Sequence, residues 1–319
     1  MTYLDVSPSP LVHPLGDNRQ LVDLIAEVTR QPVETVRQRL YHEELRLGHN
    51  VDQEVRQSGI IRNEWNEALI RFYQQTDSFL YESVAWNRNP RKLAMRQWVG
   101  DFLDRCPDRP RTILTFGDGP GFDSAFLAQR GFDVTYFEVS ALNCAFARRV
   151  FEHLQCPVRI IQDARELTPG HFDAVVCLDV LEHLHAPEES VAQFATYMRP
   201  AGKLIVHAPF YLTAGRFVTH LNRNRKKYSG AIKRLYGRHG FVLEDGRLCW
   251  DPLVLEKTSP DAARTRTRWL WKTILRVAGM AFWGGRFWSK PYTILAGLLT
   301  PPDRRWQEGL KAHKMDCPA

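Results

Sequence analysis

The sequence lacks a Cys-x-x-Cys pair, a long apolar run and a signal-like start. Its six cysteines are scattered over 319 residues, which disfavours a structural zinc site because such sites take ligands from closely spaced cysteines. No stretch supplies the roughly 20 consecutive apolar residues of a membrane-spanning helix, and the first residues lack the basic and apolar regions of a secretory signal. We therefore expect a cytoplasmic protein with free thiols and no transmembrane segment.

The chain also carries little excess charge. Its 43 Lys and Arg residues exceed its 36 Asp and Glu residues, for a formal net charge of +7 at pH 7. This is far below the charge density of a dedicated nucleic-acid arm. The basic run over 220–228 could bind an acidic substrate, a carrier-bound phosphopantetheine or nucleic acid, but a solvated face before the next helix is the default interpretation. We expect a small-molecule substrate and no nucleic-acid partner, and the sequence leaves the oligomeric state open.

Apolar residues at helical spacing dominate the first hundred residues. They predict two helices within 19–48, interrupted at Gln31-Pro32, and further helices over 63–79 and 90–103. We interpret residues 1–94 as a helical N-terminal cap, or lid. Residues 258–319 hold five of the nine tryptophans and are predicted to form a helical extension, which could be a lid, core packing or a membrane-surface contact.

Between these regions, short apolar runs alternate with helical stretches. Strands are predicted at 112–116, 133–137, 158–161, 172–178, 203–208, 241–243 and 253–256. Helices are predicted between them at 122–129, 142–154 and 188–198. This alternation predicts a Rossmann-like α/β domain over 95–257 with a doubly wound, seven-stranded, mostly parallel sheet.

A glycine-rich turn follows the first of these strands. Gly117, Gly119 and Gly121 would let the backbone turn tightly and approach a nucleotide. The pattern alone is weak evidence, but its place between a strand and a helix strengthens it.

Acidic residues end the next strands. Glu138 is near the spacing expected for a carboxylate that holds ribose hydroxyls, although it could also be a solvated strand-end residue. Asp163 could accept from an adenine amino group or could cap the helix that follows. The run 172–184 brings Asp179 to the carboxyl edge of the sheet, where α/β folds bind ligands.

Together with the turn before the fifth strand, at 198–206, these motifs resemble those of class I S-adenosylmethionine (SAM)-dependent methyltransferases. The resemblance covers about residues 95–257 and implies SAM as cofactor. It implies that the glycines line the methionine and ribose, that Glu138 holds the ribose, and that Asp163 faces the adenine. The cofactor-binding residues predicted on this basis are Thr115, Gly117, Asp118, Gly119, Gly121, Glu138, Val139, Asp163, Ala164, Leu178 and Asp179.

One position departs from the family pattern. Thr115 stands where the family usually has an acidic residue near the SAM amino group. Losing that carboxylate weakens the preference for a protonated ammonium. Asp118 could take its place, and tolerated variation is an equally good interpretation.

The candidate catalytic residues are polar side chains expected at the carboxyl edge. Methyl transfer needs an aligned nucleophile and sometimes a general base. His207 or Tyr211 could be that base, although an ordinary hydrogen-bonding role fits each of them too. His183 is interpreted mainly as structural, and we expect no metal site. The full set of catalytic candidates is Tyr136, Asn143, His207 and Tyr211.

The leading hypothesis is a SAM-dependent methyltransferase acting on an O or N nucleophile of a small molecule, in bacterial specialised metabolism. One alternative is a cyclase that closes SAM to azetidine-2-carboxylate and releases 5'-methylthioadenosine, since that reaction needs a neutral amine and Thr115 removes the usual carboxylate. A second alternative is a degenerate module that only binds.

Overall fold

The computed structural model describes residues 18–210, 217–229, 232–246 and 252–258. Six helices precede the first strand. They are α1 (Asn18–Thr29), α2 (Val33–Leu45), α3 (His49–Gln57), α4 (Glu67–Gln75), α5 (Ser78–Asn87) and α6 (Pro90–Arg105). The two helices predicted within 19–48 are confirmed as α1 and α2. Pro32 directly precedes α2, where its missing N–H costs the helix nothing.

The single helix predicted over 63–79 is wrong. Asn63 has a left-handed φ of 61°, and α4 begins only after Asn66, whose side chain accepts a hydrogen bond from Leu69 N at 2.9 Å. Thr76 is extended and ends α4. The apolar stripe therefore crosses two short helices, because local capping outweighs the periodicity.

Seven strands form one sheet in the order β3-β2-β1-β4-β5-β7-β6. Only β7 runs antiparallel to its neighbours β5 and β6. This confirms the predicted seven-stranded, mostly parallel sheet. The strands are β1 (Thr112–Phe116), β2 (Asp133–Phe137), β3 (Val158–Ile161), β4 (Phe172–Leu178), β5 (Met198–His207), β6 (Phe241–Gly246) and β7 (Leu253–Lys257).

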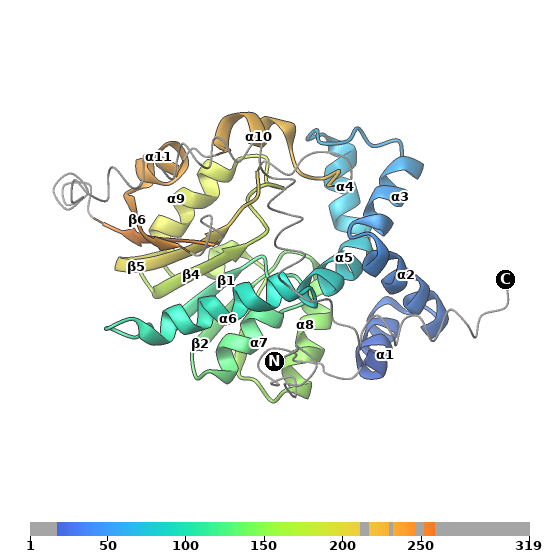
Figure 1. Cartoon of the computed structure of the whole chain (residues 1–319), viewed down its shortest axis with the longest axis horizontal. Coiled ribbons are helices and arrows are strands. Elements are labelled where there is room, and N and C mark those ends of the chain that lie inside the picture. The colour runs from blue at the N-terminus through green and yellow to red at the C-terminus, as the bar shows by residue number, and fades with distance from the viewer. Residues whose placement is uncertain (1–17, 211–216, 230–231, 247–251, 259–319) are drawn as a thin grey trace.

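Helices cover both faces of the sheet. In Figure 1, α6, α7 (Phe122–Gln129) and α8 (Ala141–His153) lie below it, and α9 (Pro187–Tyr197), α10 (Asn222–Tyr228) and α11 (Ile232–Leu235) lie above. The 3-10 turns η1 (Ala164–Glu166) and η2 (Gly237–His239) complete the set. Because both faces are covered, central strands such as β4 are buried along most of their length, as doubly wound folds require.

The helices α1–α5 lie beside the sheet and its covering helices (Figure 1) and join the domain through two apolar clusters. In the first, Ile25 and Tyr81 pack with Val150 of α8. In the second, Leu69 of α4 packs with Val218 and Leu221, which follow β5 in the chain.

The predicted domain boundary at residue 94 falls inside α6. None of the helices in the described ranges is long and apolar enough to cross a membrane. The predicted extension over 258–319 lies almost wholly outside those ranges.

Asn63 joins the cap to the segment after β5. Its backbone N–H donates to Val218 O at 2.7 Å, and its carbonyl accepts from Asn222 N at 3.0 Å. Its side-chain amide donates to Phe217 O and His220 O, both at 2.7 Å. One residue thus satisfies four backbone groups of a distant segment, in a conformation that Asn tolerates better than most residues.

We expect Asn63→Ala to lower the free energy of unfolding by about 2–3 kcal/mol, since it loses two hydrogen bonds and strains a left-handed residue. Asn63→Gly relieves the strain and should lose about half as much. Urea unfolding followed by circular dichroism measures both values. If the two variants match the wild type, the Asn63 contacts contribute nothing.

Candidate functional site

The turn between β1 and α7 requires glycine. Gly117 and Gly121 have φ values of 72° and 79°, a region that other residues rarely adopt. A Cβ atom at Gly117 would lie 2.7 Å from Val180, and one at Gly121 would lie 2.8 Å from Ala147. At these two positions no side chain covers the backbone of the turn, which is what a close approach to a nucleotide requires.

Residues of β2 and its carboxyl end hold this turn in place. The Glu138 carboxylate accepts from Gly119 N at 3.1 Å and from Ser140 N at 2.9 Å. The Tyr136 hydroxyl donates to Gly119 O at 2.6 Å. Burial raises the pKa of Glu138, although these backbone donors oppose the rise. Val139, the next residue, is 74% exposed, so an apolar side chain stands open beside the turn.

Thr115 and Asp118 both face the start of α7. The Thr115 hydroxyl lies 2.7 Å from Ser124 Oγ. The Asp118 carboxylate accepts from Ser124 N at 2.7 Å, from Ser124 Oγ at 2.6 Å and from Asp123 N at 3.2 Å. Asp118 therefore caps the helix. Burial and the neighbouring Asp123 carboxylate raise the pKa of Asp118, and its contact with the SAM amino group stays a prediction.

Asp163 caps η1. It accepts from Arg165 N at 2.9 Å and forms an ion pair with the Arg165 side chain. Hydrogen bonds from Arg165 lower the pKa of Asp163 to about 2. The capping role weighed for this residue is confirmed, and the adenine contact of Asp163 and Ala164 stays a prediction.

Asp179 organises the carboxyl edge of the sheet. It directly follows Leu178 at the end of β4 and has a left-handed φ of 63°. One of its oxygens lies 2.6 Å from His207 Nδ1, and the other accepts from Trp86 Nε1 at 2.8 Å and lies 3.4 Å from Lys92 Nζ. Burial would raise the pKa of Asp179, but His207 and Lys92 hold it well below its usual range. Asp179 is therefore ionised and can only accept hydrogen bonds.

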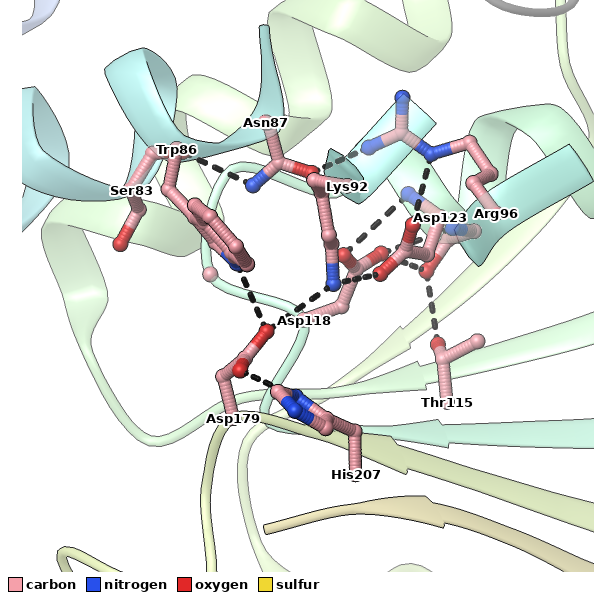
Figure 2. A network of polar contacts seen from close by, with 12 residues as sticks. Ser83, Trp86, Asn87, Lys92, Arg96, Thr115, Asp118, Asp123, Asp179 and His207 are labelled. Atoms are coloured by element: carbon pink, nitrogen blue, oxygen red, sulfur yellow. Dashed lines mark hydrogen bonds and ion pairs between the residues drawn. The ribbon is translucent and has the colours of Figure 1, made fainter. Parts of the chain in front are cut away.

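The network continues behind the glycine turn. Lys92 Nζ lies 2.9 Å from Asp123, and Arg96 Nε donates to Asp123 at 2.7 Å. Arg96 also donates to Asn87. Figure 2 shows Lys92 pointing between Asp123 and Asp179. Helices α5 and α6 of the cap are thereby tied to both sides of the glycine turn.

Sequence reasoning missed Trp86 and Lys92. No motif links these cap residues to the sheet, because they meet Asp179 only in three dimensions. A signal was present all the same. Lys92 and Arg96 are spaced i, i+4 on a helix that also buries Leu93 and Val99, and buried cations need carboxylate partners.

The four catalytic candidates lie in different settings. The hydroxyl of Tyr136 is committed to Gly119, and burial raises its pKa well above the ordinary value. Asn143 hydrogen-bonds to Glu138. Tyr211 lies outside the described residues. Of the three described, His207 is the one whose basic ring nitrogen contacts a carboxylate, that of Asp179.

A second polar cluster lies beyond Asp179. The ligand atoms of Glu182, His183 and His220 lie within 4.8 Å of one another, and this donor set could hold a metal ion. Glu182 is 1% exposed, and neither of its carboxylate oxygens has a hydrogen-bond partner among the described residues. Burial lowers the pKa of His183 to about 4, and Tyr73 OH lies 3.2 Å from its Nδ1. The expectation that no metal binds stays a prediction.

Comparison with known families agrees with the strand order and the glycine turn. The family model of the methyltransferase domain matches residues 86–247, about half of the chain. The chain belongs to the class I SAM-dependent methyltransferase family. SAM is therefore its methyl donor, and the bare turn between β1 and α7 fits that cofactor.

Among curated proteins, this methyltransferase is 31% identical over 130 residues to the ubiquinone biosynthesis O-methyltransferase of Pseudomonas paraeruginosa, covering 38% of the chain and 49% of the relative. It is 29% identical over 150 residues to the enzyme of the same name from Dechloromonas aromatica, covering 45% and 56%. The chain thus spans about half the length of the curated relatives it matches.

Among solved structures, it is similar to a magnesium protoporphyrin IX methyltransferase from Synechocystis PCC 6803, with a TM-score of 0.40, 19% identity and coverage of 62% and 95% of the two chains. It is also similar to an O-methyltransferase family protein from Burkholderia thailandensis, with a TM-score of 0.43, 17% identity and coverage of 59% and 64%.

We expect Glu138→Gln to weaken binding of S-adenosylhomocysteine by about tenfold to hundredfold, because a charged acceptor of ribose hydroxyls is lost. Isothermal titration calorimetry measures the affinity. Glu152→Gln, which changes an exposed carboxylate of α8, should bind as the wild type does. Equal affinity of Glu138→Gln and wild type would remove Glu138 from the ribose site.

A further prediction concerns Glu182. Burial and Asp179 raise its pKa in the folded protein to about 8, whereas the unfolded chain releases the proton near 4.5. Folding is therefore penalised increasingly as pH rises from about 5 to 8. Glu182→Gln removes this penalty, so its melting temperature should match the wild type at pH 5 and exceed it by about 4 °C or more at pH 8.

The control for Glu182 is Glu188→Gln in α9, where pairing with Lys227 outweighs burial and lowers the carboxyl pKa. It should show no gain at pH 8. If the wild type is instead the more stable protein at pH 8, and added Mn²⁺ or Zn²⁺ stabilises it but not Glu182→Gln, then Glu182 is ionised and ligates a cation.

Proposed function

We propose that this methyltransferase transfers the methyl group of SAM to a hydroxyl of a small molecule, with His207 as the general base. The observation that carries this proposal is the 2.6 Å contact between His207 Nδ1 and Asp179. An ionised carboxylate accepts the Nδ1 proton, so the lone pair of the neutral ring lies on Nε2. That nitrogen can take a proton from an acceptor.

The position of the pair supports this role. Asp179 follows β4 and His207 ends β5, two adjacent parallel strands, and ligands of such sheets bind at the carboxyl ends of the strands. When bound, SAM supplies an electrophilic methyl group and leaves as S-adenosylhomocysteine. Through Nε2, His207 takes the proton that the acceptor oxygen loses as its new bond to carbon forms.

The choice of an oxygen acceptor draws on the curated relatives, which are named O-methyltransferases. An amine acceptor stays within the same proposal, because His207 could take its proton equally well. The helical cap over 1–94 would cover the acceptor and exclude water, and the extension over 258–319 would add to that cover. We place the enzyme in the cytoplasm, in bacterial specialised metabolism.

Product analysis separates this function from its rivals. We expect S-adenosylhomocysteine to form only when an acceptor is present, with a matching methylated product in mass spectrometry. A cyclase would make 5'-methylthioadenosine from SAM alone. A degenerate module would form neither compound, and calorimetry would find no affinity for SAM or S-adenosylhomocysteine.

We expect His207→Gln to lower kcat by about 10²–10⁴-fold, the usual contribution of a general base, while S-adenosylhomocysteine binding is retained. The control is His153→Gln, at the exposed end of α8, whose ring contacts only Gln20 among the hydrogen bonds described, and it should keep wild-type kcat. If kcat of His207→Gln stays within a factor of about three of the wild type, His207 is not the base.

A further inference from the structure

Lys92 is a buried cation that transfers no proton in the proposed reaction. Its side chain is 3% exposed, and its ammonium lies 2.9 Å from Asp123 and 3.4 Å from Asp179. Burial disfavours the ammonium, yet the two carboxylates hold the pKa of Lys92 above its ordinary value. Burying such a charge is costly without compensation, so Lys92 is present as the counter-charge of these carboxylates.

A histidine bound to an uncompensated carboxylate makes a poor base. The negative charge favours the imidazolium form, and an imidazolium has no lone pair to accept a proton. The contact between Asp179 and His207 therefore orients the ring but, on its own, would also hold it protonated. A cation next to Asp179 on its other side removes that difficulty.

We propose that Lys92 is a positioning residue that keeps His207 in its neutral, proton-accepting form by offsetting the charge of Asp179. This inference rests on the proposed role of His207 as the base. Because Lys92 belongs to α6, docking of the cap onto the sheet also keeps His207 in the neutral form that can accept a proton. Trp86 of α5 adds a neutral hydrogen bond to the same carboxylate at 2.8 Å.

The charges around Asp179 balance when His207 is neutral. Arg96 and Lys92 supply two cations, and Asp123 and Asp179 supply two anions, in an alternating chain. A protonated His207 would leave this buried chain with an excess positive charge. Removing Lys92 would instead leave an excess negative charge, which only a protonated His207 could offset.

Other titratable groups near Asp179 and His207 add little charge at neutral pH. Burial raises the pKa of Glu82 and of Glu182, and the charge of Asp179 raises both further, to about 8. Both carboxyl groups are therefore mostly protonated at pH 7. Burial and Asp123 raise the pKa of Asp118 to about 7, so this carboxyl is about half ionised at pH 7, but its described hydrogen bonds are with the start of α7 and not with Asp179 or His207. Burial keeps His183 neutral, with a pKa of about 4. The charge of Lys92 is therefore the deciding one.

The test measures the protonation of His207 directly. The full chain is labelled with ¹³C-histidine, the His207 signal is assigned by its loss in His207→Gln, and its pKa is followed by NMR titration. Lys92→Met, which keeps the length of the side chain and removes its charge, should raise the pKa of His207 by about one unit or more. Lys92→Arg should restore a value close to the wild type.

The same shift should appear in the pH dependence of kcat/KM. Below the pKa of the free base the rate falls, so the acidic limb of Lys92→Met should move to higher pH by the amount that NMR measures. At pH 7 the variant should then lose up to about tenfold in kcat/KM for a shift of one unit, and raising the pH should recover most of it.

The matched control is Arg96→Met. It removes an equal charge from Asp123, and the contacts described for Arg96 are with Asp123 and Asn87, so it should shift the pKa of His207 by less than half as much. The double variant Lys92→Met with Asp123→Asn removes one cation and one carboxylate together, so the number of buried positive and negative charges stays equal. It should fold where the single variant does not, and should still raise the pKa of His207 because Asp179 loses its lysine.

The proposal is overturned if Lys92→Met and the double variant shift the pKa of His207 no more than Arg96→Met does, or shift it downward. Failure of the proposed function looks different. In that case the NMR shift of Lys92→Met persists, while the wild type methylates no acceptor or His207→Gln keeps its kcat.

Discussion

One buried carboxylate, that of Asp179, both joins the cap to the sheet and contacts His207 in the candidate site. Asp179 binds a tryptophan of α5, a lysine of α6 and a histidine of β5. Two parts of the chain that are far apart in sequence, the α5–α6 region and β5, are thus fixed against the end of β4. Removing one member of such a buried charged set typically costs about 3–5 kcal/mol, because the remaining charge is left without its partner. The cap therefore has one docked position in which these charges are satisfied, and that position also orients His207.

The glycine turn depends on the same arrangement from its other side. Lys92 reaches Asp123 in the first turn of α7, and Asp123 donates its N–H to Asp118 within the turn. Glu138 and Tyr136 hold Gly119 from β2. The glycine turn and the carboxyl edge of the sheet are thus held by a continuous set of polar contacts. Such bracing favours a preorganised site, in which groups need not move when the transition state forms.

Sequence patterns anticipated the sheet well and the cap poorly, for a physical reason. The bounds of β1 to β4 follow from short, mostly apolar runs, which are largely buried in β1, β2 and β4 and only partly buried in β3. Their hydrogen bonds and packing agree with local propensity. The cap helices are short, so single residues decide them. Asn66 starts α4, and Asn63 bends the chain to meet residues 217–222. Trp86 and Lys92 reach Asp179 only through the fold, and no local signal specifies which carboxylate a buried lysine will meet.

The charges around Thr115 offer a reason why this position carries no carboxylate. The neighbourhood already buries Asp118, Asp123 and Asp179, and the cations that reach it, Lys92 and Arg96, are engaged with Asp123 and Asp179. Asp118 accepts its described hydrogen bonds from neutral donors at the start of α7, and burial and Asp123 raise its pKa. A carboxylate at position 115 would add another anion beside Ser124 and Asp118, at a cost that grows in a low-dielectric interior. A threonine hydroxyl contacts Ser124 without adding that charge, and the carboxylate three residues further along, Asp118, caps the start of α7.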